Sequence, residues 1–395
     1  MDLELLLMIS VPAAFVVFGL GWVAARVDIR QLVESSKTLP RSYFRGLNFL
    51  LNEEPDRAID SFIEAVQLDA DTVELHFTLG GMFRTRGETD RAIRIHESLL
   101  ARSDLSAELR DRASLELAND FFKAGMLDRA ESGFVALIGS PSCSHEALQS
   151  LMEVYEIEKE WKRAIDTAHA LETAAGRSLS PRIAQFHCEL AQTALGHSHF
   201  DDAERHLKAA RDADRNSVRA AILQGELEME RGEPQRAIDC WMTIEKLSVL
   251  HMALIGPPLM QAYRDVGKPA EGLRLLRSVL AQSPSIDLLG LIYTETLTQE
   301  GAEAAHAIVL EELRRSPTLI GLDKLVEARA ALVPAELSSE LDLVKGLLHQ
   351  ETRKLSRYTC GHCGFRAHRF YWQCPGCRHW NTYVPRRVEE LEVIR

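Results

Sequence analysis

Small and apolar residues recur along most of the chain at a nearly constant interval. A seven-residue pattern whose third residue is alanine, seen as DRAIDSF at 56–62 and as QRAIDCW at 235–241, occurs six times. The six alanines are separated by 34, 38, 34, 39 and 34 residues and are Ala58, Ala92, Ala130, Ala164, Ala203 and Ala237. A small residue stands twelve positions before all but one of them: Gly46, Gly80, Ala118, Ala191 and Gly225, with Met152 as the exception. Such a period predicts pairs of antiparallel helices that stack on one another.

This period is that of the tetratricopeptide repeat. The small residues let the two helices of a repeat approach closely, while large side chains such as Phe62 and Phe83 fill the space between repeats. Two weaker units follow, around Gly272 and Ala305, before a helical stretch to residue 352 whose period the sequence does not define. We therefore predict an all-α solenoid of seven to eight repeats over residues 39–352. The surface of such a solenoid binds other proteins and does not catalyse a reaction.

An uncharged apolar segment, residues 5–25, precedes the repeats. At about 1.5 Å per residue, a helix of this length just crosses a hydrocarbon core of roughly 30 Å, so we predict a transmembrane anchor at 1–26 and a linker at 27–38. A cleaved signal peptide would have basic residues before the apolar run, but Asp2 and Glu4 stand there. The alternative, a buried helix of a soluble protein, usually has a polar edge.

Basic residues follow the apolar segment and do not precede it: Arg26, Arg30, Lys37, Arg41 and Arg45. The positive-inside rule therefore predicts a single-pass protein with the bulk of the chain in the cytoplasm. Three cysteines that stand singly within helical patterns, Cys143, Cys188 and Cys240, agree with a reducing compartment. The small residues Gly21 and Ala25, four positions apart, leave a homo-oligomer possible.

The net charge of −12 is unevenly distributed. Residues 353–387, the C-terminal module, hold eight Lys or Arg and no Asp or Glu, which leaves 38 basic against 58 acidic residues elsewhere. Because an acidic body repels nucleic acid, we predict no nucleic-acid partner. Single-strand binding stays an alternative, since the module mixes basic with aromatic residues.

Four cysteines of the C-terminal module form two Cys-x-x-Cys pairs ten residues apart: Cys360, Cys363, Cys374 and Cys377. This spacing predicts one tetrahedral metal ion, zinc or iron. Four cysteines leave no open coordination position, so we predict a structural site whose metal supplies much of the module's folding free energy. Residues 388–395 form a short tail, and no motif of an enzyme accompanies the site.

Histidines and aromatic residues surround these cysteines. We predict that His362, His368 and His379 are surface or packing residues, because four cysteines already complete the coordination shell. The aromatic residues are too many for so small a module to bury: Tyr358, Phe365, Tyr371, Trp372 and Trp380. We expect some of them to pack against the last helices of the repeats.

The first helix of each repeat offers candidate contacts to a partner protein. Extrapolation of the inward-facing positions gives Glu74, Phe77, Arg84, Arg112, Asn119, Lys123, Gln192 and Glu226. The alternative for each is an ordinary solvated helix face.

Several stretches together resemble one bacterial family. They are the apolar N-terminal segment, RSYFRGLNFLL at 41–51, FTLGGMFRTRGETDRAIRIH at 77–96, and CGHCGF with YWQCPGCRHW at 360–365 and 371–380. Their order is similar to that of the lipopolysaccharide assembly protein B family of Gram-negative bacteria. The resemblance implies an inner-membrane adaptor that assists the FtsH protease in degrading the LpxC deacetylase of lipid A synthesis, and that responds to an inner-membrane lipopolysaccharide sensor.

The resemblance also implies that the four cysteines are metal ligands and that the metal module folds back on the repeats. The chain departs from rubredoxins in two ways. Rubredoxins have a longer gap between the two cysteine pairs than the ten residues here, and they have glycine after the pair where Arg378 follows Cys377 here. These departures favour zinc over iron. The remaining alternatives are a rubredoxin-like redox protein on a repeat scaffold and a generic scaffold for membrane enzymes.

Overall fold

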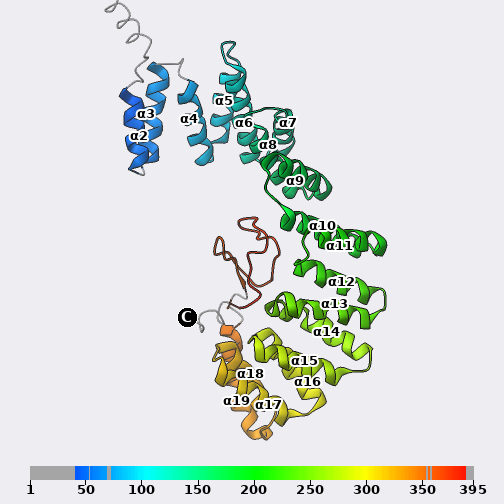
Figure 1. Ribbon diagram of the computed structural model, residues 1–395. Helices are drawn as coiled ribbons and strands as arrows, with labels where there is room; N and C mark the ends of the chain where they lie inside the picture. Colours follow the sequence, from blue (N-terminus) through cyan, green and yellow to red (C-terminus); the bar gives the residue numbers. More distant parts are fainter. Residues whose placement is uncertain (1–40, 53, 69–72, 353–354, 356–357, 388–395) are drawn as a thin grey trace, which may run out of the picture. The chain divides into compact units, whose positions relative to one another are not determined.

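The computed structural model describes residues 41–52, 54–68, 73–352, 355 and 358–387. The predicted transmembrane segment 5–25 lies outside these residues, as do the predicted linker 27–38 and tail 388–395. Within the described ranges, no helix has the length and apolar character needed to cross a membrane. The fold of the described part is mostly helical (Figure 1).

The chain divides into two compact units, Met1–Val154 and Tyr155–Arg395. Helices that begin in the first unit are α2 (Arg41–Leu51), α3 (Pro55–Leu68), α4 (Val73–Thr85), α5 (Thr89–Leu100), α6 (Ala107–Lys123), α7 (Leu127–Ala136) and α8 (Ser144–Glu158). Helix α8 crosses the boundary between the units.

The second unit continues the helical series. Its helices are α9 (Trp161–Ala175), α10 (Ser180–Gly196), α11 (Phe200–Ala213), α12 (Val218–Glu230), α13 (Pro234–Leu247), the 3-10 helix η1 (Val249–His251), α14 (Met252–Asp265), α15 (Pro269–Gln282), α16 (Ile286–Gln299), α17 (Ala302–Arg315), α18 (Leu319–Ala330) and α19 (Ala335–Thr352). In chain order, the α-helices of the described residues make nine helix–turn–helix units. The stretch whose period the sequence did not define is the last of them, α18 and α19.

The two helices of a repeat pack closely where a glycine on the first helix faces an aromatic or histidine ring on the second. A Cβ added at Gly80 would lie 2.4 Å from the His96 ring, and one added at Gly225 would lie 2.1 Å from Nε1 of Trp241. Trp241 is fully buried, and its Nε1 donates to the carbonyl of Ile222 at 3.0 Å. The steric role predicted for these small residues is confirmed.

The alanines of the repeated pattern lie at the centre of the first six repeats. All six are fully buried, at 0% exposure: Ala58, Ala92, Ala130, Ala164, Ala203 and Ala237. The turns within repeats use glycine in the left-handed region, with φ of 80°, 76° and 76° at Gly87, Gly125 and Gly232. Sequence period and tertiary packing therefore agree through both units.

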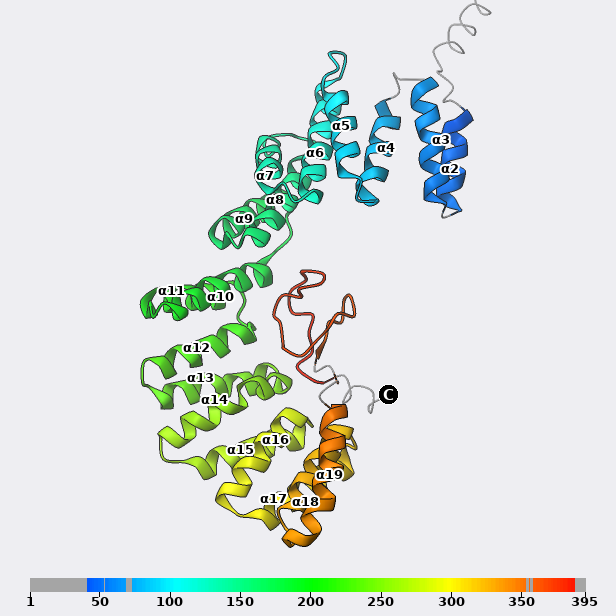
Figure 2. The ribbon, with the colours of Figure 1, turned by 180° about the vertical axis from the view of Figure 1, so that it is seen from behind.

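The C-terminal module contains the strands of the described part. Strand β1 (Tyr358–Thr359) pairs antiparallel with β2 (Arg366–Ala367), and single bridges join Cys360 to Tyr383 and Gln373 to Trp380. Within the second unit, Figures 1 and 2 show the module on the inner side of the row of helices from α10 to α18. It folds back on the repeats, as the resemblance implied.

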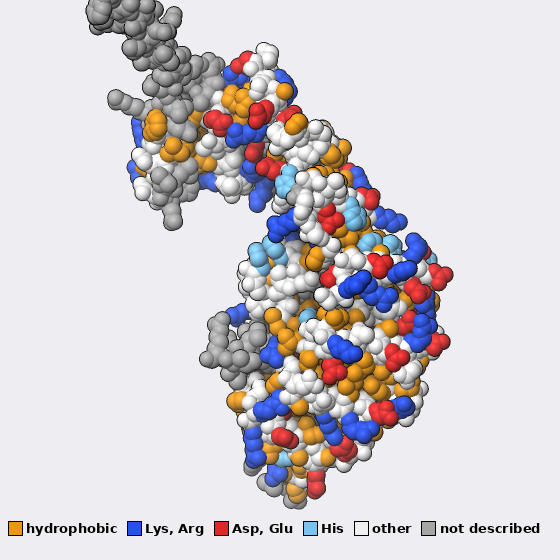
Figure 3. Space-filling view, viewed as in Figure 1, with side chains coloured by type: hydrophobic (Ala, Val, Ile, Leu, Met, Phe, Trp, Pro, Cys, Tyr) orange, Lys and Arg blue, Asp and Glu red, His pale blue; other side chains and the backbone are white. Residues whose placement is uncertain are grey.

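Some of the module's aromatic residues were expected to pack against the last helices, and two of them do. The Tyr358 hydroxyl lies 3.4 Å from Asp287 of α16, and Trp372 packs against an apolar cluster that extends from α12 to α18. Trp380 meets α9 and α10, and Trp372 meets η1. The module thus also reaches helices far earlier in the sequence. Acidic and basic side chains mingle over the face of the second unit in Figure 3, in contrast to the module, which has no acidic residue.

Candidate metal centre

Two short turns of equivalent geometry hold the four cysteines. In each turn, the amide of the first cysteine donates to the carbonyl five residues on, and its carbonyl accepts from the amide four residues on, at distances of 2.8–2.9 Å. The turns are residues 360–365 and 374–379. This backbone pattern directs both cysteines of a pair to the same side, as the Cys-x-x-Cys spacing predicted.

The two turns differ at the residue after the second cysteine. Gly364 has a φ of 74°, and Arg378 at the equivalent position has a φ of 60°. Both lie in the left-handed region, which a residue with a side chain occupies at a cost of roughly 1–2 kcal/mol. The second turn therefore keeps a backbone that glycine would adopt without strain.

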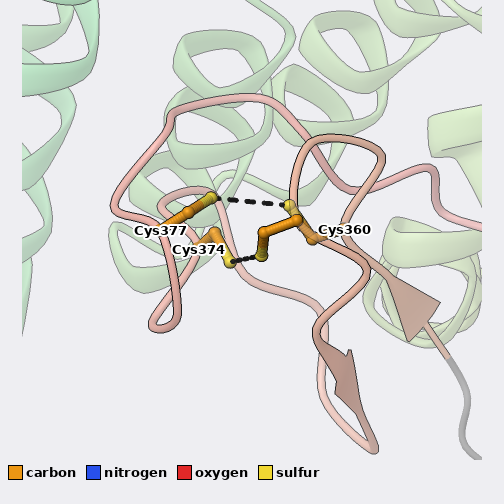
Figure 4. A group of neighbouring side chains, drawn as sticks. Cys360, Cys374 and Cys377 are labelled. Carbon is orange, nitrogen blue, oxygen red and sulfur yellow. Dashed lines mark hydrogen bonds between the residues drawn. The ribbon is translucent and has the colours of Figure 1, made fainter. Parts of the chain in front are cut away.

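The four sulfur atoms converge (Figure 4). All lie within 4.8 Å of one another, with 3.7 Å between the sulfurs of Cys360 and Cys377 and 3.7 Å between those of Cys363 and Cys374. A tetrahedral ion with metal–sulfur bonds of about 2.3 Å would hold neighbouring sulfurs about 3.8 Å apart. Cys360 and Cys374 are buried, at 1% exposure, whereas Cys363 is exposed.

Hydrogen bonds and crowding act unevenly on the four thiols. Burial by itself raises the pKa of Cys360, but hydrogen bonding with the Thr382 hydroxyl, 3.2 Å from its sulfur, and with backbone amides outweighs burial and lowers the pKa to about 6. For Cys377, a backbone amide favours the thiolate, but burial and the neighbouring sulfurs outweigh it and raise the pKa to about 12.

These residues fit a metal ion. The sulfur atoms are close enough to hinder the ionisation of one another, so four thiolates need a compensating cation. When bound, the ion would join the two turns and supply folding free energy, and Cys360, Cys363, Cys374 and Cys377 would hold it. Zinc and iron both suit four thiolates.

The histidines beside the site lie at the surface. His362 and His379 are exposed, and their rings stack with centroids 3.7 Å apart, next to Cys377. His368 is exposed as well. Their exposure fits the prediction of surface or packing residues.

Glu156, near the end of α8, is the central acceptor where the module docks on the second unit. Its carboxylate accepts from Nε2 of Gln373 at 3.1 Å and from Nε1 of Trp380 at 3.4 Å. The other carboxylate oxygen pairs with Arg182 of α10 at 2.5 Å. Glu156 is buried, at 6% exposure, so its charge depends on these partners.

The Trp380 ring enters an aromatic pocket formed by two repeats. It meets Trp161 and Phe186 edge to face, each with ring centroids 6.1 Å apart. Arg219 of α12, itself buried, lies 5.9 Å from the centre of the same ring. Edge-to-face pairs and cations over rings each stabilise such contacts by about 0.5–1.5 kcal/mol.

A second ring contact lies at η1. His251 stacks on Trp372 with centroids 5.7 Å apart and an angle of 7° between the rings, and Phe370 meets it edge to face. Nδ1 of His251 lies 2.7 Å from the hydroxyl of Ser248. Burial in this stack lowers the pKa of His251 to about 4.

The end of the module is tied to α16 and to the preceding loop. Arg387 pairs with Asp287 at 2.6 Å, and the hydroxyl of Tyr358 lies 3.4 Å from the same carboxylate. Arg386 donates to the hydroxyl of Ser283 at 3.0 Å. Sequence reasoning missed these docking residues, because a helical pattern does not indicate which helical position meets a segment 71–103 residues away.

Four of the predicted partner contacts bridge repeats in the first unit. Arg112 of α6 pairs with Glu74 of α4 at 2.8 Å and covers the ring of the buried Phe77, 4.2 Å from its centre. Arg84 pairs with Glu116 and Asp120, both on α6. Much of their charge is therefore used to join neighbouring repeats.

An open groove of about 470 Å³ lies between α4 and α6. It is lined by Phe77, Thr78, Gly81, Met82, Arg84, Thr85, Arg112 and Glu116. The structure thus brings three predicted contacts together around one groove and gives it an apolar floor.

The other predicted contacts do not join this groove. Asn119 is half-buried and Lys123 is exposed on α6. In the second unit, Glu226 is exposed, and the exposed Gln192 accepts from Arg219 at 2.7 Å, which links it to the docking site of the module.

Comparison with known proteins agrees with this architecture. A model described as the rubredoxin metal binding domain matches residues 358–385, and one described as the tetratricopeptide repeat matches residues 188–241. Lipopolysaccharide assembly protein B of Escherichia coli K12 is 34% identical over 391 residues, which cover 98% of each chain. The chain belongs to the lipopolysaccharide assembly protein B family.

Further members and solved structures are also similar. Lipopolysaccharide assembly protein B of Haemophilus influenzae is 28% identical over 392 residues, covering 96% of this chain and 97% of that protein. A tetratricopeptide repeat protein from Parabacteroides merdae aligns with a TM-score of 0.35 and 15% identity, covering 78% of this chain and 100% of that one.

Proposed function

We propose that the chain is an inner-membrane adaptor that controls lipopolysaccharide synthesis by bringing the LpxC deacetylase to the FtsH protease. Membership of the lipopolysaccharide assembly protein B family, at 34% identity over nearly the whole chain, is the observation that carries this proposal. An inner-membrane lipopolysaccharide sensor would act upstream. The repeat scaffold and its closed cysteine site favour a protein with no catalytic activity of its own.

The proposed location is the inner membrane, with a single span at residues 5–25 and the repeats in the cytoplasm. Its support is the uncharged length of that segment and the basic residues that follow it. This topology would keep the repeats close to a membrane protease while they capture a soluble enzyme.

The groove between α4 and α6 is the proposed capture site of the first unit. Its apolar floor, Phe77 and Met82, lies beside the Arg112–Glu74 pair. An extended protein segment could bury apolar side chains on the floor and exchange hydrogen bonds with the charged rim. No strong acidic or basic selectivity is expected, because the arginines already have carboxylate partners.

In the C-terminal module we propose a zinc ion. The metal would fold the two turns, and the folded module would then present Trp372 and Trp380 to the repeats. Metal binding would in this way fix the geometry of the inner side of the second unit.

The experiment is depletion of the protein in its own host, followed by measurement of LpxC half-life. We expect the half-life to lengthen severalfold and to return to normal when the wild-type chain is restored. As a matched control, a chain without residues 1–26 should be made at the same level and fail to restore it. An unchanged LpxC half-life after depletion would refute the adaptor proposal.

A redox protein is the second candidate, favoured by the match to a rubredoxin metal binding domain and by the exposure of Cys363. Elemental analysis of protein purified from native cells separates the two. Stoichiometric iron that is reversibly reduced would support the redox protein, and stoichiometric zinc would exclude it.

A further inference from the structure

Three arginines of the C-terminal module have no partner among the described residues. Arg366, Arg369 and Arg378 are exposed, and their guanidinium groups make no hydrogen bond or ion pair with any residue that the structure describes. The two arginines at the end of the module differ, because both are bound to the repeats. Among the described residues, the module thus uses two arginines for docking and leaves these three exposed.

Large apolar side chains are exposed beside these arginines. Phe365, 43% exposed, directly precedes Arg366, and its ring packs over Gly376, where an added Cβ would come within 3.1 Å of it. The ring therefore joins the two cysteine turns. The exposed Arg366 follows it directly in the sequence, and the exposed Arg378 lies two residues beyond the glycine that the ring contacts. Tyr371, 38% exposed, adds a second ring.

We propose that the exposed face around the Phe365 ring, formed by Phe365, Arg366 and Arg378, binds a segment of a partner protein in which carboxylates flank an apolar side chain. The planar guanidinium group matches a carboxylate through two parallel hydrogen bonds. The apolar side chain would cover the exposed Phe365 ring. Residues 353–387 contain no Asp or Glu that could repel such a segment.

The charge of the rest of the chain selects a short segment over an extended polyanion. Outside the module the chain has 58 acidic and 38 basic residues. Charges further apart than a Debye length of about 8 Å are largely screened at physiological salt, so a short acidic segment on the face experiences mainly the arginines. A membrane surface or a long nucleic acid would also meet the acidic helices.

This inference deepens the proposed adaptor role and rests on it only in taking a protein as the partner. It assigns partner binding to the module, in addition to the groove of the first unit. Docking of the module on the repeats uses other residues, such as Trp380 and Arg387, so the face can be altered while docking is kept.

The test uses the full chain in nanodiscs with its metal bound, and a fluorescein-labelled peptide EELEELEEL as the probe. Anisotropy titrations compare the wild type, the variant R366E/R378E and the control variant R211E/R274E. Arg211 and Arg274 are exposed on α11 and α15, so the control changes the net charge equally. We expect at least a tenfold rise in Kd for R366E/R378E and less than a twofold change for the control.

Further titrations with other ligands show which kind of molecule binds the face. The charge-swapped peptide KKLKKLKKL should bind R366E/R378E better than the wild type. The proposal is overturned if the wild type does not bind EELEELEEL, if both variants weaken equally, or if only phosphatidylglycerol vesicles or an oligo-dT strand bind. Metal content is measured for every variant, and R366A/R378A replaces the glutamate variant if that one loses its metal.

The same variants distinguish this proposal from the adaptor function. If R366E/R378E restores the normal LpxC half-life in depleted cells as well as the wild type does, the face has no part in that function and the inference fails while the adaptor function stands. If depletion itself leaves the LpxC half-life unchanged, the adaptor function fails. The peptide titration then still tests whether the face binds an acidic segment.

Discussion

The guanidinium carbon of Arg219 lies 5.9 Å from the centre of the Trp380 ring. Arg219 belongs to α12 and Trp380 to the C-terminal module. The contact therefore joins a repeat to a segment that lies far later in the sequence. The guanidinium also donates to Glu189 and Gln192 of α10, each at 2.7 Å. One buried cation thus connects two repeats and the metal module.

Replacement of Arg219 by alanine should loosen the module. Loss of its contacts with the Trp372 and Trp380 rings predicts that docking weakens by about 1–2 kcal/mol. Tryptophan emission during urea titration measures docking, because Trp380 and Trp372 would become exposed on release. Arg274→Ala, on an exposed position of α15, is the control and should change the midpoint little. Equal midpoints for both variants would contradict the role of Arg219.

Removal of the metal should unfold the module and leave the repeats intact. Structural metal in small modules contributes on the order of 10 kcal/mol, more than the docking contacts can replace. A chelator, or Cys360→Ser, should therefore shift tryptophan emission to longer wavelength while the helical circular dichroism signal is largely kept. Cys240→Ser, a half-buried thiol on α13, controls for the substitution itself. Unchanged emission after complete metal loss would show that the module does not depend on its ion.

Arg378→Gly should stabilise the module. Its φ of 60° is strained for arginine, and relief of that strain exceeds the entropy cost of glycine, which predicts a gain of about 0.5–1 kcal/mol. Gly364→Ala, at the equivalent position with a φ of 74°, should lose about 1–2 kcal/mol. The chelator concentration needed for half-release of the metal reports both changes. A loss of stability in Arg378→Gly would mean that the arginine side chain contributes more than its backbone costs.

Docking should weaken as the pH falls. The pKa of His251 is about 4 when docked, below its ordinary value near 6.5 when exposed. Since the undocked state binds the proton more tightly, the contribution of His251 is complete above about pH 6.5 and is lost as the pH falls towards 4. We expect a loss of about 1 kcal/mol between pH 7.5 and 5.5.

The His251→Gln variant isolates this effect. Titration of the cysteines at low pH acts on both proteins, so only the difference between them reports the histidine. That difference in the urea midpoint of docking should shrink as the pH falls, because the wild type alone loses the contribution of a neutral imidazole. A difference that does not vary with pH would exclude His251 as the titrating group.

Gly225→Ala should destabilise the second unit. The added Cβ would lie 2.1 Å from Nε1 of the buried Trp241, and overpacking of this kind costs about 1–3 kcal/mol. Gly290→Ala on α16 is the control, because its Cβ would meet only a lysine side chain at 3.9 Å and alanine favours helix by up to about 1 kcal/mol. Thermal unfolding of both variants checks the contrast, and an unaffected Gly225→Ala would show that the helix pair can separate freely.

Much of the fold could be predicted from the sequence, because it depends on residues that are close together along the chain. The spacing of Ala58, Ala92 and their equivalents predicted the helix pairs, because each repeat packs mainly on its neighbours in sequence. The two Cys-x-x-Cys pairs predicted the convergence of four sulfurs, because two residues between cysteines suffice to close a turn. In both cases the interacting residues are separated by short distances along the chain.

Long-range contacts followed no such rule. Glu156, Arg219, His251 and Asp287 occupy ordinary helical positions, and nothing in their spacing indicates that they meet residues of the module. Arg84 and Arg112, which the sequence offered as partner contacts, line a groove, and their ion pairs with Glu116 and Glu74 depend on how neighbouring repeats stack.

Period, cysteine spacing and charge distribution were enough to define a repeat protein with a metal module, since each of these properties is local or additive. Which helices receive that module, and which arginines remain exposed after it docks, depended on the path of the chain after α19. That path brings Trp380 to Trp161 and Phe186 across a large separation in sequence. Such contacts are specified by the summed shape and burial of many residues, and no short motif encodes them.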